Sequence, residues 1–335
     1  TCIGSFKFNY RLGSPRQLPR CEIMEHPLLQ SYGPLEGWHI LLAIGVVSIG
    51  FFSYQVQKAT RLVMLGSSDS RFDSWSIRIK EFISGWLFQK KVLRDKVAGI
   101  MHVLMFWGFL MLSTDMFDLA TANAFSEKVL PEILVGPWNG MVELGYFMAL
   151  IGCVSALTRR VVFTPEKLKG KSQLEGNAIL LLIFTITTTS FMVESAESPS
   201  AFWEPIGYWF SERGLSEQTV ILSYWAHMLA ISVFLFLIPL SKHMHLVMAV
   251  PNVFFHDAGP MARMRPLALG DDGKAVPLED LDIDSFGVST YNQYSWRQLI
   301  DGWSCTSCAR CQDVCPAYAS GKGLNPMQVI HDVRN

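Results

Sequence analysis

The chain has 335 residues, half of them hydrophobic and only 17% charged, and its formal net charge is −1. Soluble domains carry about 25% charged residues, so this composition indicates a membrane protein. The lack of a basic excess excludes a protein that binds nucleic acid through bulk charge.

The first 35 residues contain proline, arginine and glycine but no apolar stretch typical of a signal peptide. We expect residues 1–35 to form an extracytoplasmic segment. Cys2 and Cys21 would form a disulfide there if the compartment is oxidising, and would otherwise stay reduced. Cys153 lies in an apolar stretch further on, where a buried, unreactive thiol is the simplest interpretation.

Five apolar segments follow, each close to the ~20 residues that a bilayer-spanning helix needs. They cover residues 37–56, 97–119, 141–157, 178–193 and 220–240. A soluble helical core is the alternative, but these segments show little amphipathic alternation. The sequence therefore predicts an all-α membrane protein with a five-helix bundle over residues 36–250.

The charges between these segments predict the orientation of the chain. Nine lysines and arginines lie between the first and second segments, and five follow the third. The loop after the second segment has only Lys128, and the loop after the fourth is acidic. Since basic loops stay inside, we expect the N-terminus outside and the C-terminal tail in the cytoplasm, at a bacterial or archaeal cytoplasmic membrane.

Beyond residue 250 the sequence becomes rich in Gly, Pro and Asp, which predicts a cytoplasmic linker over residues 251–295. The remaining residues, 296–335, contain the stretch CTSCARCQDVCP with Cys305, Cys308, Cys311 and Cys315. The spacing C-x2-C-x2-C-x3-C-P is that of a bacterial [4Fe-4S] site. A zinc site is the alternative, although such sites usually pair two C-x2-C units across a longer loop.

The four cysteines form a single run, which leaves two arrangements open. Either Cys315 completes the cluster of its own run, or it serves a second cluster whose cysteines are not in this sequence. We expect the natural polypeptide to continue beyond Asn335.

Four histidines lie in or at the ends of apolar segments: His39, His102, His227 and His245. Ionisable residues inside a bilayer are costly and are functional candidates. Beside an iron–sulfur motif, histidines on different helices favour haem b, whose iron takes one imidazole from each of two helices.

Helical phase predicts how the histidines pair. His227 and His245 are 18 residues apart, or five helical turns, so they would share one face about 27 Å apart, unless Pro239 bends the helix. We therefore predict two haems, an outer one between His39 and His227 and an inner one between His102 and His245. A single haem between His102 and His227 is the alternative.

Two stretches, AGIMHVLMFWGFL and WAHMLAISVFLFLIPLSKHMH, resemble the gamma subunit of respiratory nitrate reductase, a dihaem quinol-oxidising cytochrome b. The resemblance implies haem ligands at His102, His227 and His245. The position of that family's remaining ligand holds Leu112 here, so His39 would have to replace it.

The tail CTSCARCQDVCPAYASGKGLNPMQVIHDVRN resembles the first cluster segment of heterodisulfide-reductase-like iron–sulfur proteins. Chains that join both modules include the membrane-bound electron-transfer-flavoprotein:menaquinone oxidoreductases, and PLSKHMHLVMAVPNVFF is similar to them. In that group a second cysteine run and Cys-rich domains follow.

The resemblance implies a quinone-linked oxidoreductase that passes electrons between an electron-transfer flavoprotein, a [4Fe-4S] cluster, haem b and menaquinone. Acidic residues near the outer helix ends are candidate proton carriers at a quinone site, or simply solvated helix ends: Asp115, Asp118, Glu143 and Glu194. Two alternatives stay open. One is a quinol-linked subunit of a heterodisulfide-reductase-like thiol–disulfide or sulfite-reduction complex, and the other is a redox-inactive membrane anchor with a zinc-binding tail.

Overall fold

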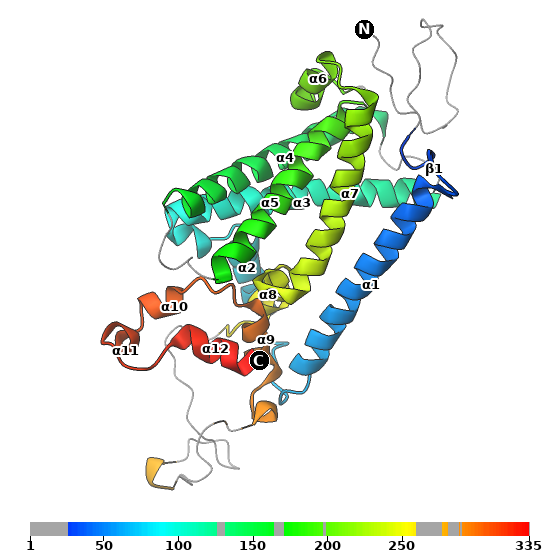
Figure 1. Cartoon of the computed structure of the whole chain (residues 1–335). Helices are drawn as coiled ribbons and strands as arrows, with labels where there is room; N and C mark the ends of the chain where they lie inside the picture. The colour runs from blue at the N-terminus through cyan, green and yellow to red at the C-terminus, as the bar shows by residue number, and fades with distance from the viewer. Residues whose placement is uncertain are drawn as a thin grey trace, which may run out of the picture. The chain divides into compact units, whose positions relative to one another are not determined.

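A computed structural model of the chain describes residues 26–125, 131–163, 171–196, 199–258, 277–280, 288 and 290–334 (Figure 1). The predicted Cys2–Cys21 pair and much of the predicted linker lie outside these residues.

Five long helices dominate the described chain. They are α1 (Gly37–Val63), α3 (Lys96–Phe125), α4 (Glu132–Val161), α5 (Lys171–Glu194) and α7 (Glu217–Leu240). Among the described residues, five helices are long and apolar enough to cross a membrane, which confirms the five predicted segments. The helices run past the apolar segments because flanking polar residues continue the hydrogen-bonded turns at the helix ends.

Shorter elements connect the long helices. A two-stranded antiparallel hairpin, β1 (Ser31–Tyr32) and β2 (Leu35–Glu36), precedes α1 and turns at Gly33, whose φ is +73°. Helix α2 (Trp75–Phe82) runs directly into the π-helical turn η1 (Ile83–Leu87), and η2 (Val92–Arg94) follows before α3. Helix α6 (Pro205–Glu212) precedes α7. The sequence predicted loops, not helices, at α2 and α6.

In the described residues after α7, all the helices are short. After α7 come η4 (Lys242–Met244) and α8 (His245–Phe254), so the predicted boundary after residue 250 falls inside a helix. The single turns η5 (Leu278–Asp280) and η7 (Tyr291–Gln293) follow. The last four helices are α9 (Trp296–Ser304), α10 (Arg310–Asp313), α11 (Pro316–Ala319) and α12 (Pro326–Arg334).

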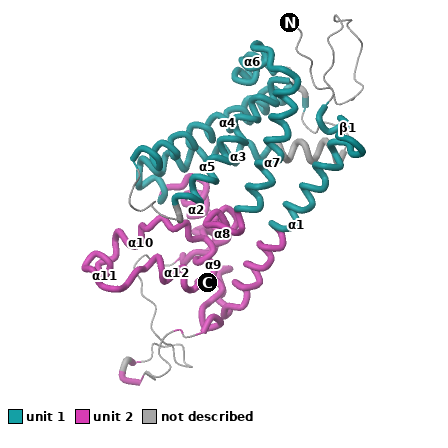
Figure 2. Tube along the Cα trace, in the orientation of Figure 1, with its two compact units in different colours: residues 1–52, 91–237 teal, residues 53–90, 238–335 magenta. Residues whose placement is uncertain are grey.

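The chain divides into two compact units, coloured separately in Figure 2. Unit 1 comprises Thr1–Phe52 and Lys91–Leu237, and unit 2 comprises Ser53–Lys90 and Ile238–Asn335. Helix α1 belongs to unit 1 over its first part and to unit 2 over its last.

Small residues bring α3 and α4 together in unit 1. A Cβ atom at Gly108 of α3 would lie 2.7 Å from the carbonyl oxygen of Gly145, and one at Gly145 would lie 2.7 Å from Met111 Cβ. Ala149 is completely buried at the same contact. Close backbone approach through small residues is how helices associate where lipid offers no hydrophobic driving force.

Unit 2 has a core that joins segments distant in sequence. It contains Ala59 and Val63 from α1, Met244 and Met248 around the start of α8, and Leu299 and Ile300 from α9, with Val333 of α12 packed against it. The N-terminus of α9 is fixed by a capping box, in which the Ser295 side chain accepts from Gln298 N and the Gln298 side chain accepts from Ser295 N. Helix α9, which leads to the first cysteine, is therefore held firmly within unit 2.

Candidate functional site

The four cysteines lie on the loop and short helices that follow α9. Cys305 ends α9, Cys311 lies in α10, and Cys315 is the N-cap of α11, where its Sγ accepts a hydrogen bond from Tyr318 N at 3.5 Å. Cys305 and Cys315 are half-buried, whereas Cys308 and Cys311 are exposed.

The backbone of this loop has an unusual shape. Ser307 and Ala309 adopt left-handed conformations, with φ of +56° and +60°. Such residues are uncommon at positive φ and mark a local constraint. Where right-handed and left-handed backbone conformations alternate, successive N–H groups point into one concavity, called a nest. Nests are found around iron–sulfur clusters. Four thiols on such a loop fit an iron–sulfur cluster in donor type and in backbone shape.

The thiols themselves are not gathered in the structure. Within the described part of the chain, no three His, Cys, Asp or Glu side chains are grouped so that they could hold a metal ion. Burial raises the pKa of the Cys305 thiol above its ordinary value. Ligation of this thiol therefore requires the loss of a proton that the unliganded loop retains.

His331 is a neighbour of the cysteine loop that the sequence did not single out. Its Nε2 atom lies 3.1 Å from Ser307 Oγ and 3.7 Å from Cys305 Sγ. Helix α12 carries it there by packing on α9, where Arg334 stands over the Trp303 ring. The sequence shows only that a histidine follows the cysteines. Its contact with Ser307 and Cys305 depends on tertiary packing, which no local pattern reveals.

Helix α8 is hydrogen-bonded to α9 directly before the first cysteine. The Ser304 hydroxyl accepts from Asn252 Nδ2 at 2.8 Å, and its single proton lies between Ile300 O of its own helix at 2.7 Å and Met248 O at 3.3 Å. Asn252 Nδ2 also donates to Asp301, and Arg297 donates to Phe255 O at 2.9 Å. The residue before Cys305 is therefore tied to the helix that begins at His245.

His245 has a ring orientation typical of an axial ligand. Its Nδ1 lies 2.9 Å from Lys242 O, and a carbonyl oxygen can only accept, so Nδ1 carries the proton. The neutral ring then has its lone pair on Nε2, the atom that binds iron. Burial lowers the pKa of His245, which favours this neutral form.

His227 has the same tautomer for the same reason. Its Nδ1 lies 3.1 Å from Ile186 O, and the hydroxyls of Thr189 and Ser190 approach it at 3.1 and 3.3 Å. All three acceptors come from α5. Histidines that bind metals usually donate the other ring N–H to a carbonyl or a similar acceptor, which fixes the orientation of the ring.

His39 is placed differently. Its Nδ1 accepts a hydrogen bond from Glu36 N at 3.2 Å, and its ring stacks on Trp38 at 3.6 Å. The neutral ring then carries its proton on Nε2, so this conformation offers iron no lone pair. His227 has its partners on α5 and His39 has Glu36 and Trp38, so the outer pair stays a prediction.

The remaining predicted ligand, His102, lies half-buried in α3. It belongs to unit 1 and His245 to unit 2, so the inner pair stays a prediction. Leu112, further along α3, lies close to α4: a Cβ atom at Gly145 of α4 would be 3.2 Å from Leu112 N.

Of the acidic candidates, Glu143 has a clear structural partner. Its buried Oε1 accepts from Ile206 N and Gly207 N, both at 2.7 Å, at the start of α6. It thus satisfies N–H groups that a helix start leaves unpaired. Glu194 lies beside the same turn, since a Cβ atom at Gly207 would be 3.2 Å from its Oε2. The side chains of Asp115 and Asp118 lie outside the described residues.

Unit 1 also contains an apolar crevice of about 370 Å³ between α1 and α7. Its lining residues are Ala43, Ile44, Val47, Ser48, Leu229, Ser232, Val233 and Phe236. Leu229 is about 200° around α7 from His227, so the crevice and the histidine lie on different faces. Such a slot suits a hydrophobic chain better than a polar group.

Comparison with known proteins finds two relatives that match most of this chain. The chain is 26% identical over 309 residues to the "Probable iron-sulfur-binding oxidoreductase FadF" of Bacillus subtilis, covering 88% of this chain and 42% of that protein. It is 28% identical over 308 residues to the "EtfAB:quinone oxidoreductase" of Syntrophomonas wolfei, covering 86% and 42%. The chain thus spans less than half the length of these two curated relatives.

A shorter match has a related name. Over 68 residues, 19% of this chain, it is 37% identical to 10% of a "Probable membrane-anchored ferredoxin" of Chromohalobacter salexigens. No family model matches the chain. No solved structure matches it either.

Proposed function

We propose that this chain is the membrane-embedded part of an oxidoreductase that passes electrons between an electron-transfer flavoprotein and a membrane quinone. A [4Fe-4S] cluster on Cys305, Cys308, Cys311 and Cys315 and b-type haem would carry the electrons. One observation carries the proposal: the cysteine loop, with its left-handed residues, belongs to the same chain as five helices long and apolar enough to cross a membrane. It directly follows α9, whose last residue Ser304 is hydrogen-bonded by Asn252 of the helix that begins at His245.

The names of the relatives supply the partners in this proposal. One relative is an EtfAB:quinone oxidoreductase and another an iron–sulfur-binding oxidoreductase. The exposed thiols of Cys308 and Cys311 would leave one side of the cluster open to a soluble donor. By the charge of the loops, this side faces the cytoplasm.

The residues of the chain have definite tasks in this scheme. A cluster supplies one-electron transfer at the membrane surface, and the protein sets its position and its electronics. Ser304 and Asn252 fix the end of α9, so that Cys305 stays at a constant distance from α8. Met248, whose carbonyl oxygen lies 3.3 Å from the Ser304 hydroxyl, is one helical turn from His245. Electrons would therefore need to cross only the α8–α9 contact to reach the inner haem.

Within the bundle, α5 fixes the Nδ1 side of His227, so that its Nε2 would bind the outer haem, and His102 and His245 would ligate the inner haem. His39 is the proposed second ligand of the outer haem, and it must release its hydrogen bond from Glu36 N before it can bind. The apolar crevice between α1 and α7 would accept the isoprenoid tail of menaquinone.

The testing experiment is cofactor analysis of the full chain, purified anaerobically from membranes. We expect about four iron and four sulfide per chain beyond haem iron for one cubane, and two b haems by pyridine haemochrome. Cys311→Ser should abolish the cluster and Cys153→Ser should leave it intact, since Cys153 is buried beside Leu180 O. His227→Ala should remove one haem and His256→Ala none.

Four outcomes would contradict the proposal or part of it. Zinc without sulfide would overturn the iron–sulfur assignment. A single haem would overturn the two-haem arrangement, and no haem would leave the helices as an anchor. Reduction of the cluster by a thiol–disulfide couple, but not by a reduced flavoprotein, would overturn the choice of donor.

A further inference from the structure

The segment between α1 and α3 contains a helix whose polarity is inverted. In α2, the guanidinium-bearing Arg78 is 1% exposed, whereas its apolar neighbours Ile77 and Ile79 are 43% and 48% exposed. A helix of a soluble domain turns its charges outward and its aliphatic side chains inward. The outer face of α2 is therefore built for surroundings other than water.

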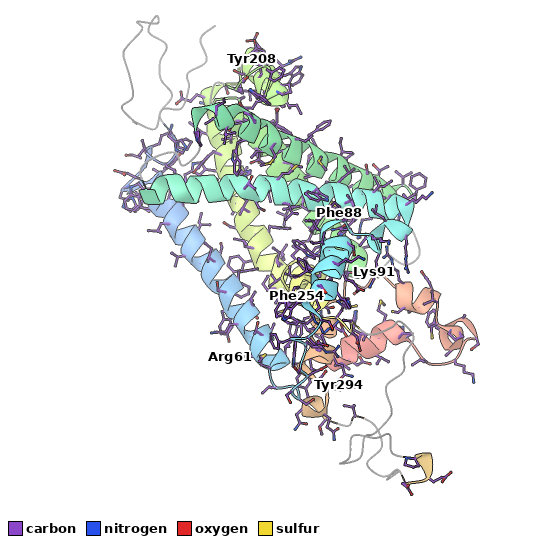
Figure 3. The ribbon with its side chains drawn as sticks, turned by 180° about the vertical axis from the view of Figure 1, so that it is seen from behind. Arg61, Phe88, Lys91, Tyr208, Phe254 and Tyr294 are labelled. Carbon is purple, nitrogen blue, oxygen red and sulfur yellow. The ribbon has the colours of Figure 1, made fainter. Side chains whose placement is uncertain are left out.

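The exposed apolar face extends beyond α2. Trp75, Ile79 and Ile83 follow each other at intervals of four residues, so they form one stripe along α2 and η1. Phe72 precedes this stripe and Phe88, labelled in Figure 3, follows it, and both are largely exposed. We call Phe72, Trp75, Ile79, Ile83 and Phe88 the apolar stripe.

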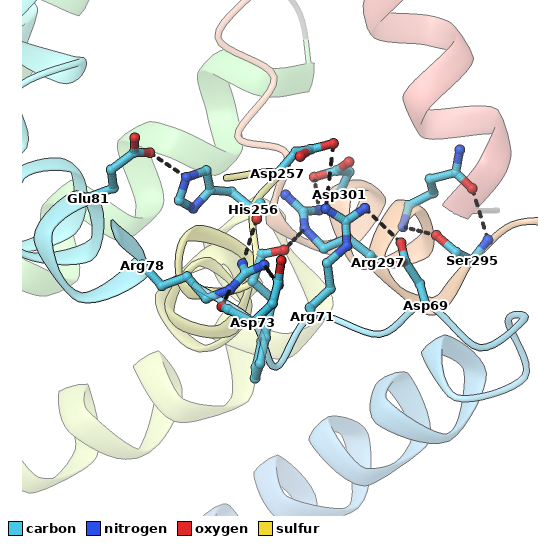
Figure 4. Close-up of polar contacts among 12 residues, drawn as sticks. Asp69, Arg71, Asp73, Arg78, Glu81, His256, Asp257, Ser295, Arg297 and Asp301 are labelled. Carbon is cyan, nitrogen blue, oxygen red and sulfur yellow. Dashed lines mark hydrogen bonds and ion pairs between the residues drawn. The ribbon is translucent and has the colours of Figure 1, made fainter. Parts of the chain in front are cut away.

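Contacts on the buried side of α2 fix the rotation of the helix about its axis. Arg78 donates to Asp73 O and to His256 O, both at 2.7 Å, and also to Phe254 O (Figure 4). The last two carbonyls lie at the C-terminal end of α8, where unpaired carbonyls attract a cation. Phe82 packs its ring against Phe254. This anchor keeps the apolar stripe facing outward.

The charges around the stripe favour an anionic partner. All three carboxylates between residues 64 and 90 are engaged within unit 2: Asp69 with Arg71, Asp73 with Arg78, and Glu81 with His256. Lys80 and Lys90 are exposed and lie beside the stripe in sequence. The segment therefore presents apolar side chains and exposed lysines, while Asp69 and Asp73 are paired with arginines of the same segment.

We propose that the stripe lies in the headgroup region of the bilayer as an interfacial helix, and that Lys80 and Lys90 bind anionic phospholipid headgroups. Amphipathic segments with aromatic residues and lysines bind membrane surfaces in this way. The segment starts where one membrane-spanning helix ends and stops where another begins, so the bilayer surface is its nearest large partner. This inference requires neither cluster nor haem.

The test uses the intact protein in nanodiscs that contain a phospholipid with a photoreactive diazirine high on its acyl chain. The discs are made of phosphatidylcholine alone or with phosphatidylglycerol. Lipid adducts are mapped by mass spectrometry, and hydroxyl-radical oxidation of the same samples reports contact with water. Val46 and Ile49, exposed on α1, are the lipid reference, and Tyr318, exposed on α11, is the water reference.

We expect adducts on Trp75, Ile79 and Ile83, little oxidation of Trp75, and a higher adduct yield in discs that contain phosphatidylglycerol. Lys80→Glu/Lys90→Glu should lower that yield to the level seen in phosphatidylcholine alone, while Lys322→Glu, on an exposed residue after α11, should not. Each lysine at an anionic surface favours binding about fivefold.

The other outcomes overturn the proposal. Oxidation of Trp75 without adducts would place the stripe in water. The absence of both adducts and oxidation would show that a protein covers the apolar stripe. Adducts that respond neither to phosphatidylglycerol nor to Lys80→Glu/Lys90→Glu would overturn the role of the lysines.

Discussion

Three of the described histidines have a ring whose Nδ1–H donates to a main-chain carbonyl, and one of them is His256, which donates to Val253 O at 2.8 Å. His227 uses Ile186 O and His245 uses Lys242 O. Without such a bond an imidazole exchanges its proton between two nitrogens and rotates about two side-chain bonds. With it, the ring is held in one tautomer with Nε2 as the basic atom. In His227 and His245, Nε2 is thus the nitrogen that would bind the iron of the proposed haems.

The contact between His331 and the cysteine loop predicts a change in reduction potential. A ligated Cys305 thiolate can only accept, so His331 Nε2–H would donate to it. Donors to cluster sulfur stabilise the added negative charge of the reduced state. His331→Leu should therefore shift the midpoint potential of the cluster to more negative values, and His331→Gln should shift it less.

A redox titration followed by electron paramagnetic resonance measures this shift. Val329→Ala, on an exposed position of the same helix, is the matched control and should leave the potential unchanged. Equal potentials in wild type and His331→Leu would show that His331 does not donate to the cluster.

At the scale of elements, the α3–α4 contact depends on the absence of side chains. A Cβ atom at Gly145 would lie 2.7 Å from Met111 Cβ and 3.0 Å from Gly108 O. Gly145→Ala should therefore lower the free energy of unfolding by about 1–3 kcal/mol. Gly45, on α1, has nothing within 4 Å, and Gly45→Ala should raise it by up to about 1 kcal/mol through helix propensity.

Unfolding in mild detergent, titrated with a denaturing detergent and followed by circular dichroism, separates these two variants. Equal effects of the two substitutions would mean that the close approach of α3 and α4 does not limit stability.

The anchor of α2 predicts a dependence of stability on pH. The hydrogen bond from Arg78 holds the pKa of Asp73 below its usual value. Because the folded-state pKa is lowered, this bond stabilises unit 2 above the ordinary Asp pKa of about 4 and loses its effect as the pH falls through the folded-state pKa. Limited proteolysis between residues 64 and 90 should therefore change little between pH 6 and 5 and become faster as the pH falls below about 4 and Asp73 protonates.

Asp73→Asn is the control for this behaviour. It keeps a hydrogen-bond acceptor but cannot titrate, so proteolysis of the variant should start faster and change less between these pH values. An unchanged pH dependence in Asp73→Asn would assign the effect to another group.

For the whole molecule, an odd number of spans predicts that the two ends of the chain lie on opposite sides of the membrane. With five candidate spans among the described residues, the basic loops predict that the cysteine segment lies in the cytoplasm. Green fluorescent protein fused after Arg334 should fluoresce and alkaline phosphatase there should be inactive. Alkaline phosphatase inserted at Gly214, between α6 and α7, should be active. The reverse pattern would invert the proposed topology.

The sequence predicted the long elements because twenty apolar residues in a row have few structural solutions. The sequence analysis missed α2 and α6, since eight-residue helices are stabilised mainly by tertiary contacts. For α2 this contact is Arg78 with the end of α8, and for α6 it is Glu143 with the first N–H groups of the helix. The cysteines could be identified from spacing alone. The partners of His227 on α5, the capping role of His39 and the position of His331 depend on which helices meet, and no local pattern encodes that.

The unequal exposure of the four cysteines has a consequence for how the protein matures in the cell. Cys305 is partly enclosed at the end of a firmly held helix, whereas Cys308 and Cys311 are open to the surroundings. A preformed cluster can thus be handed over by a scaffold protein after the helices have entered the membrane, with no need to unfold the chain. If a cluster is bound there, the same openness leaves it accessible to dioxygen.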